Sequence, residues 1–130
     1  MTILESVGRT RSFDQDAVLD RTVDLFARTG YEGTSIDDVV AATGLHRGSL
    51  YAAFGSKRGL FRAALQRAVA QRVDRAGDLV LVALVELAPR DLDIRAQCRL
   101  AYEELFADEP ARLGAHLLAR AGLNTEEEYS

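Results

Sequence analysis

Apolar side chains recur at helical spacing along most of the chain. Between Val18 and Phe26 they return every three or four positions, while aspartates occupy the other faces. Ser12 and Gln15 have the spacing of a reciprocal N-terminal cap, and Gly30 follows the last apolar turn as a C-terminal cap. The pattern therefore predicts a first helix of about fifteen residues that starts at Ser12 and ends before Gly30.

Three further helices are predicted in close succession. Thr34 or Ser35 can cap the second one, which ends at Gly44. The third and fourth are expected over His46 to Ala53, with Leu50 and Phe54 in the core, and from Ser56 onward, with an apolar stripe from Leu60 to Val69. Two short helices joined by a glycine-containing turn of about three residues form a helix-turn-helix arrangement.

The helical pattern continues in three segments beyond Arg75. We expect helices over about 78–87, 91–107 and 111–121, with Pro89 and Pro110 between them. No segment alternates between apolar and polar residues as a half-buried β-strand does. The predicted fold class is therefore all-α.

Composition and charge narrow the class of protein. The chain has 130 residues, of which 48% are apolar, and no apolar run approaches the length of about 18 residues that a membrane span needs. The lone Cys98 excludes an intrachain disulfide framework, which suits a reducing cytoplasm, and the N-terminus does not resemble a secretion signal. Residues 9–75 hold 11 basic and 8 acidic side chains, whereas residues 76–130 hold 5 and 11. The first half can therefore face a polyanion.

The segment "GLHRGSLYAAFGSK", residues 44–57, combines cations, a tyrosine and an unusual helical glycine. Gly48 costs about 1 kcal/mol of helix propensity relative to alanine, a loss that is tolerable where a Cβ would hinder close approach to nucleic acid. An arginine can bind guanine O6 and N7 with a bidentate fork, and hydroxyl, imidazole and ammonium groups can reach base edges or phosphates. The candidate DNA contacts are His46, Arg47, Gly48, Ser49, Tyr51 and Lys57, together with Thr34 or Ser35 at the second helix and Arg9 and Arg11 in the N-terminal arm.

Several motifs at fixed separation resemble the DNA-binding region of TetR/AcrR-family bacterial transcriptional regulators. They are "LF...GY" at the end of the first helix, "TSIDDV", "TGL", "GSLYAAF" and "SK", while "GRTRSFD" is similar to the basic lead-in of one branch of the family. The resemblance covers about residues 9–69. It implies that the counterparts of Arg47, Gly48, Ser49, Tyr51, Lys57 and the threonine of the second helix contact DNA.

The same resemblance implies a cytoplasmic repressor that binds a palindromic operator as a homodimer and is released by a small-molecule effector. The expected domains are a flexible basic arm at 1–11, the helix-turn-helix DNA-binding domain at 12–55, a connecting helix at 56–75, a shortened helical region for ligand binding or dimerisation at 76–124, and a polar tail at 125–130. The chain departs from the family pattern after Arg75, where 55 residues suffice for three helices.

Each candidate has a simpler structural interpretation. Arg47 and Lys57 can be solvated cations, Tyr51 a half-buried core residue, His46 merely exposed, Thr34 and Ser35 helix caps, and Arg9 and Arg11 a solubilising tail. In the C-terminal half, an effector pocket could be lined by Cys98, Tyr102, Phe106, His116 and Leu117, and the alternative is that these residues only pack between helices. Exposed leucines there would favour a dimer interface.

Catalytic and metal-binding functions find little support in the sequence. His116 and Cys98 have no partner at a diagnostic spacing, and no set of histidine, cysteine and carboxylate residues has the spacing of a zinc site. We therefore expect neither an enzyme, a metal site nor a cofactor. The rival hypothesis is an interaction protein or truncated regulator that pairs with a full-length relative and modulates it.

Overall fold

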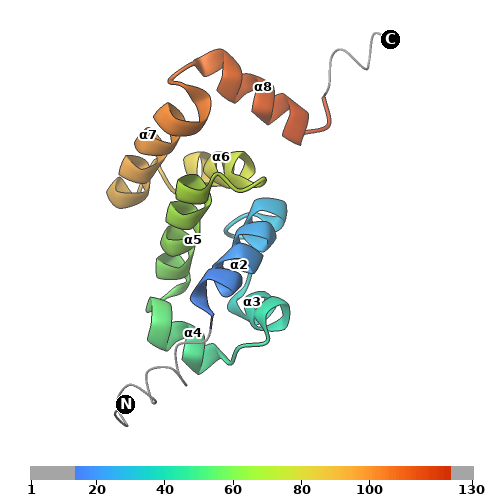
Figure 1. Ribbon diagram of the computed structural model, residues 1–130, viewed down its shortest axis with the longest axis vertical. Coiled ribbons are helices and arrows are strands. Elements are labelled where there is room, and N and C mark those ends of the chain that lie inside the picture. Colours follow the sequence, from blue (N-terminus) through green and yellow to red (C-terminus); the bar gives the residue numbers. More distant parts are fainter. Residues whose placement is uncertain (1–13, 124–130) are drawn as a thin grey trace.

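The computed structural model describes residues 14–123, and within that range it contains helices and no strand, which confirms the all-α prediction (Figure 1). The helices are α2 (Gln15–Thr29), α3 (Ile36–Thr43), α4 (Arg47–Phe54), α5 (Lys57–Gln71), α6 (Ala76–Glu86), α7 (Leu92–Phe106) and α8 (Pro110–Arg120). Each lies within a few residues of its predicted range. None of these helices is both long and apolar enough to cross a membrane.

The N-terminal cap of α2 differs from the prediction. Asp14 is the capping residue, and its carboxylate accepts a hydrogen bond from the backbone N–H of Ala17 at 3.1 Å. Gln15 is the first helical residue, so it cannot reach back as the partner of a cap at Ser12, which lies outside the described residues. The prediction was wrong because two capping residue types stand close together, and the acid also interacts favourably with the positive end of the helix dipole.

The other predicted helix ends in the first half are confirmed. Ser35 forms a capping box with Asp38: its hydroxyl accepts from the Asp38 N–H at 3.0 Å, and its own N–H donates to the Asp38 carboxylate at 2.8 Å. Gly44 ends α3 in the left-handed region, with φ of 76°. Ser56 caps α5 by accepting from the N–H of Gly59 at 2.9 Å. These caps fix the start of α3 and of α5 and the turn between α3 and α4.

The helix-turn-helix is built around one aromatic cluster. Phe26 of α2 and Phe61 of α5 are fully buried, and their rings meet edge to face with centroids 5.1 Å apart. The ring of Tyr31, in the α2–α3 turn, packs 5.3 Å from the ring of Phe61. Since Leu50 is the one buried residue of α4, the short helix depends on its neighbours α3 and α5 for its position. Figure 1 shows α4 at one end of the molecule and α8 at the other.

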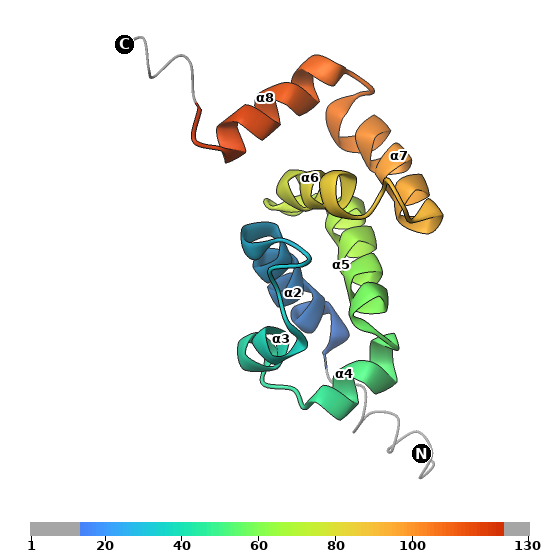
Figure 2. The ribbon, with the colours of Figure 1, turned by 180° about the vertical axis from the view of Figure 1, so that it is seen from behind.

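The C-terminal half is less uniformly packed. Helix α6 is enclosed by its neighbours and buries most of its side chains, whereas α8 contains no buried residue between Pro110 and Arg120. Pro110 was expected to separate two helices and is instead the first residue of α8, a position where proline is favoured because its missing N–H would be unpaired anyway. Seen from behind, α8 lies above α6, on the side of the molecule opposite α4 (Figure 2).

Polar contacts of Glu86 and Arg58 are among those that join the C-terminal half to the helix-turn-helix. The Glu86 carboxylate, at the end of α6, accepts the backbone N–H groups of Tyr31 at 3.1 Å and Glu32 at 2.9 Å. The Arg58 guanidinium, at the start of α5, donates to the carboxylate of Asp91, the N-cap of α7, and holds the pKa of that carboxyl well below its usual range. These contacts fasten the α2–α3 turn to α6 and the start of α5 to the start of α7.

Candidate nucleic-acid interface

The face of α4 that carries Arg47 and Tyr51 lies open to solvent. The Arg47 side chain is 54% exposed and Tyr51 is 40% exposed. These residues are four positions apart, so they share one side of the helix, and Leu50 points to the core. His46, the residue before α4, is also exposed and makes no side-chain cap. Nothing in the described part of the chain covers this face.

Gly48 is not required by the internal packing of the protein. A Cβ placed on it would meet nothing within 4 Å, and its φ is not in the left-handed region. A glycine inside a helix still lowers helix stability by about 1 kcal/mol relative to alanine. The packing of the described residues therefore gives no reason for a glycine at this position.

Lys57 lies at the start of α5, where its ammonium group sits 4.4 Å from the centroid of the Tyr31 ring. Its charge also reaches the start of α3: hydrogen bonds from Ser35 hold the pKa of Asp38 below its ordinary value, and the charge of Lys57 adds to that effect. The start of α5 therefore lies against the α2–α3 turn. Free backbone N–H groups at such helix starts favour anions.

The structure separates the two candidates at the start of α3. Ser35 is exposed, whereas Thr34 is fully buried and its hydroxyl donates to the carbonyl of Gly30 at 2.6 Å. The prediction of a DNA contact by the Thr34 side chain is therefore corrected: this threonine stabilises the α2–α3 turn. The sequence left both residues open because each has an aspartate three positions later, Asp37 for Thr34 and Asp38 for Ser35.

The remaining predicted DNA contacts divide into two groups. Ser49 is partly exposed on α4. Arg9 and Arg11 lie outside the described residues. One residue that the sequence did not single out adjoins the site, since Asp37 of α3 forms an ion pair with Arg47 of α4. No periodicity signals this contact, because ten positions and a turn separate the two residues.

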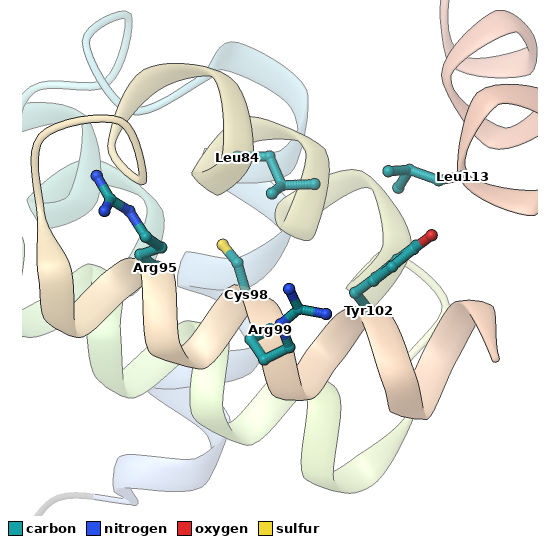
Figure 3. Close-up of a pocket in the computed structure, with 6 residues that line it drawn as sticks. All are labelled: Leu84, Arg95, Cys98, Arg99, Tyr102 and Leu113. Atoms are coloured by element: carbon teal, nitrogen blue, oxygen red, sulfur yellow. The ribbon is translucent and has the colours of Figure 1, made fainter. Parts of the chain in front are cut away.

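The predicted effector pocket is only partly reproduced. A groove of about 250 Å³ between α6, α7 and α8 is lined by Leu84, Arg95, Cys98, Arg99, Tyr102 and Leu113 (Figure 3). Of the five predicted residues, it includes Cys98 and Tyr102. Burial raises the pKa of the Cys98 thiol to about 11, so it stays protonated near neutral pH.

The other three predicted pocket residues lie elsewhere. Phe106 is buried, and its ring packs edge to face with the His116 ring at 5.7 Å between centroids. The His116 Nε2 is 2.9 Å from the Asp78 carboxylate, and Leu117 is 47% exposed. Phe106 and His116 therefore pack between helices, which is the alternative given above, and the packing of α8 on α6 leaves Leu117 outside the groove.

Comparison with known proteins agrees with the architecture of the first half. Residues 18–64 match the model of "Bacterial regulatory proteins, tetR family". The chain is 51% identical over 65 residues to the HTH-type transcriptional repressor ComR of Escherichia coli, which is 50% of this chain and 31% of ComR. It is 38% identical over 80 residues to the uncharacterized HTH-type transcriptional regulator YezE of Bacillus subtilis, which is 56% of this chain and 41% of YezE.

A more distant relative is a regulator of a biofilm operon. The icaADBC HTH-type negative transcriptional regulator IcaR of Staphylococcus aureus is 34% identical over 47 residues, 36% of this chain and 25% of IcaR. The matched part therefore spans less than half the length of each of these curated relatives. No solved structure matches the chain. The segment from α2 into α5 is therefore similar to the tetR family of bacterial regulatory proteins.

Proposed function

We propose that the chain is a sequence-specific DNA-binding transcriptional regulator that represses a promoter by placing α4 in the major groove. The observation that carries this proposal is Gly48, which is exposed between two polar residues and has no internal reason to be glycine. A recognition helix presents its N-terminal residues to base edges, which is where Arg47 and Gly48 lie. The repressor name of ComR and the negative-regulator name of IcaR favour repression.

The proposed roles follow from the chemistry of each group. Arg47 offers a fork of donors to guanine O6 and N7. Tyr51 and Lys57 bind phosphates through a hydroxyl and an ammonium group, and the N–H groups at the start of α3 and α5 add neutral donors. His46, Ser49 and Ser35 complete the contact surface.

Substitutions on this surface are expected to separate phosphate binding from base reading. Tyr51→Phe and Lys57→Ala should weaken binding to every sequence, and Lys57→Ala should reduce the salt slope of log K by about 1. Arg47→Ala should instead lose about 1–3 kcal/mol of discrimination at one base pair. Mobility shifts at two salt concentrations, with specific and nonspecific duplexes, measure both effects.

A matched control and a contrary outcome sharpen this test. Arg90→Ala removes the same charge from the exposed connection between α6 and α7 and should leave DNA binding unchanged. Equal loss of specific and nonspecific binding in Arg47→Ala would contradict the assignment of Arg47 to a base. A chain that binds no DNA at low salt would overturn the proposed function itself.

We further propose that the regulator is a homodimer whose contact includes α8. This helix buries none of its residues, and Leu117 and Leu118 are 47% and 45% exposed. Two recognition helices can then read half-sites about 34 Å apart on one face of a palindromic operator. A small-molecule effector bound in the groove beside Tyr102 would release the operator only if it binds one dimer arrangement more tightly than the other.

The dimer proposal predicts a change of mass on substitution. At tens of micromolar, light scattering on the wild-type protein should give the mass of two chains. The double variant Leu117→Glu, Leu118→Glu should give the mass of one chain with unchanged helix content, because a dimer would have to desolvate the new charges in its interface. Leu92→Glu, at a 74% exposed position of α7, is the matched control. A monomeric wild-type chain under these conditions would rule the dimer out.

A further inference from the structure

The ion pair between Asp37 and Arg47 bridges the two helices of the helix-turn-helix. Nη2 of Arg47 donates to Oδ1 of Asp37, from the first turn of α4 to the first turn of α3. The capping box of Ser35 and Asp38 fixes the backbone from which Asp37 projects, and Gly44 fixes the turn between the helices. The backbone that carries the Asp37 carboxylate is therefore held in place beside Arg47, the residue proposed to read a base.

The ion pair between Asp37 and Arg47 adds little to the stability of the fold, so stability does not explain why an acid stands at position 37. The side chains are 79% exposed in Asp37 and 54% exposed in Arg47, and an exposed ion pair contributes little to the stability of a fold. A carboxylate on a surface that meets DNA also repels the phosphates. An acid at this position thus lowers the affinity for DNA of any sequence. A compensating gain is needed to explain why Asp37 is there.

The geometry supplies such a gain through the shape of the guanidinium group. Arginine carries five N–H donors, and the contact with Asp37 engages Nη2, so Nε and Nη1 keep donors for base edges. A long arginine side chain loses rotamer entropy when it binds. A guanidinium group already held by Asp37 loses less rotamer entropy when it binds the correct base. A wrong base still leaves donors of Arg47 unpaired.

We propose that Asp37 is a positioning residue that orients Arg47 and thereby sets the sequence selectivity of the reading helix. This inference rests on the proposed function. Orientation strengthens binding to the correct base, and the negative charge weakens binding through phosphates. Both effects raise the ratio of specific to nonspecific affinity.

Selection from a randomised double-stranded DNA pool tests this inference with the full chain. Wild type, Asp37→Ala, Arg47→Ala and the double variant are compared by sequencing the enriched duplexes. Wild type should prefer a G·C pair at one position of each half-site, and Asp37→Ala should reduce that preference about fivefold to tenfold at the same position. Because Asp37 acts through Arg47, the double variant should show no greater loss of preference than Arg47→Ala alone.

A matched acid separates position from net charge. Glu32→Ala removes an equal charge from the α2–α3 turn, leaves the pair intact and should keep the preference of wild type. If Asp37→Ala only strengthens binding to all duplexes and keeps the base preference, Asp37 is a repelling charge and the inference is overturned. If wild type enriches no sequence, the proposed function fails as well, which is a different result from a preference that survives the loss of Asp37.

Discussion

Replacing Phe61 with alanine is expected to reduce the free energy of unfolding by about 3–5 kcal/mol, the largest effect of any single substitution considered for this chain. The Phe61 side chain is fully buried in α5, and its ring contacts those of Phe26 at 5.1 Å and Tyr31 at 5.3 Å between centroids. Its removal opens a cavity between α2 and α5. A domain of this size has only about 5–15 kcal/mol of stability to lose.

Urea unfolding followed by circular dichroism measures this loss. Phe61→Leu is the informative control, because it keeps most of the apolar volume and should lose clearly less stability than alanine. Both variants are expected to keep the slope of free energy against urea, which reports the surface exposed on unfolding. A loss below about 1 kcal/mol for Phe61→Ala would mean that the α2–α5 contact is not the core of the helix-turn-helix.

The same substitution reaches the proposed DNA contacts through Tyr31. The Tyr31 ring contacts both Phe61 and the ammonium group of Lys57, which is 4.4 Å from its centroid. Without Phe61 the tyrosine has no fixed support on that side. At temperatures where Phe61→Ala is still folded, Lys57 should therefore be less well placed for a phosphate.

Local signals explain why so much of the fold could be predicted from the sequence. Helix ends depend on a few neighbouring residues, and the predicted caps at Gly30, Gly44 and Ser56 are all observed. The two ambiguities arose where similar residues compete within a short segment. Asp14 caps α2 in place of Ser12, and Ser35 rather than Thr34 caps α3. Capping preferences rank residue types, but they do not say at which of two neighbouring candidates the backbone enters the helix.

In the candidate site, too, features that depend on near neighbours in sequence could be predicted, whereas contacts between distant residues could not. The period of α4 indicates that Arg47 and Tyr51 share a face and that Leu50 is buried, and the structure agrees. Contacts between residues far apart in sequence carry no such signal. The ion pair of Arg47 with Asp37 and the position of His116 against Asp78 depend on how whole helices pack.

The second large effect is expected at Glu86, whose carboxylate fastens the end of α6 to the α2–α3 turn. Glu86→Ala should reduce the free energy of unfolding by about 1–3 kcal/mol, since it leaves two backbone donors, Tyr31 N–H and Glu32 N–H, without their charged acceptor. Glu86→Gln keeps one acceptor oxygen and should lose less. Glu103→Ala, at an exposed position of α7, is the matched control and should stay within about 0.5 kcal/mol of wild type.

Amide hydrogen exchange distinguishes this local role from a general loss of stability. In Glu86→Ala the amides of Tyr31 and Glu32 should exchange about tenfold faster or more, while the Phe26 amide in the core of α2 should change only by the global loss. Gly30 belongs to the same contact, because a Cβ there would come within 2.8 Å of the Glu86 carboxylate. Unchanged exchange at Tyr31 and Glu32 would mean that α6 can move without the turn. Faster exchange would make Glu86 the link by which a displacement of α6 reaches the reading end, because the turn it holds leads directly into α3.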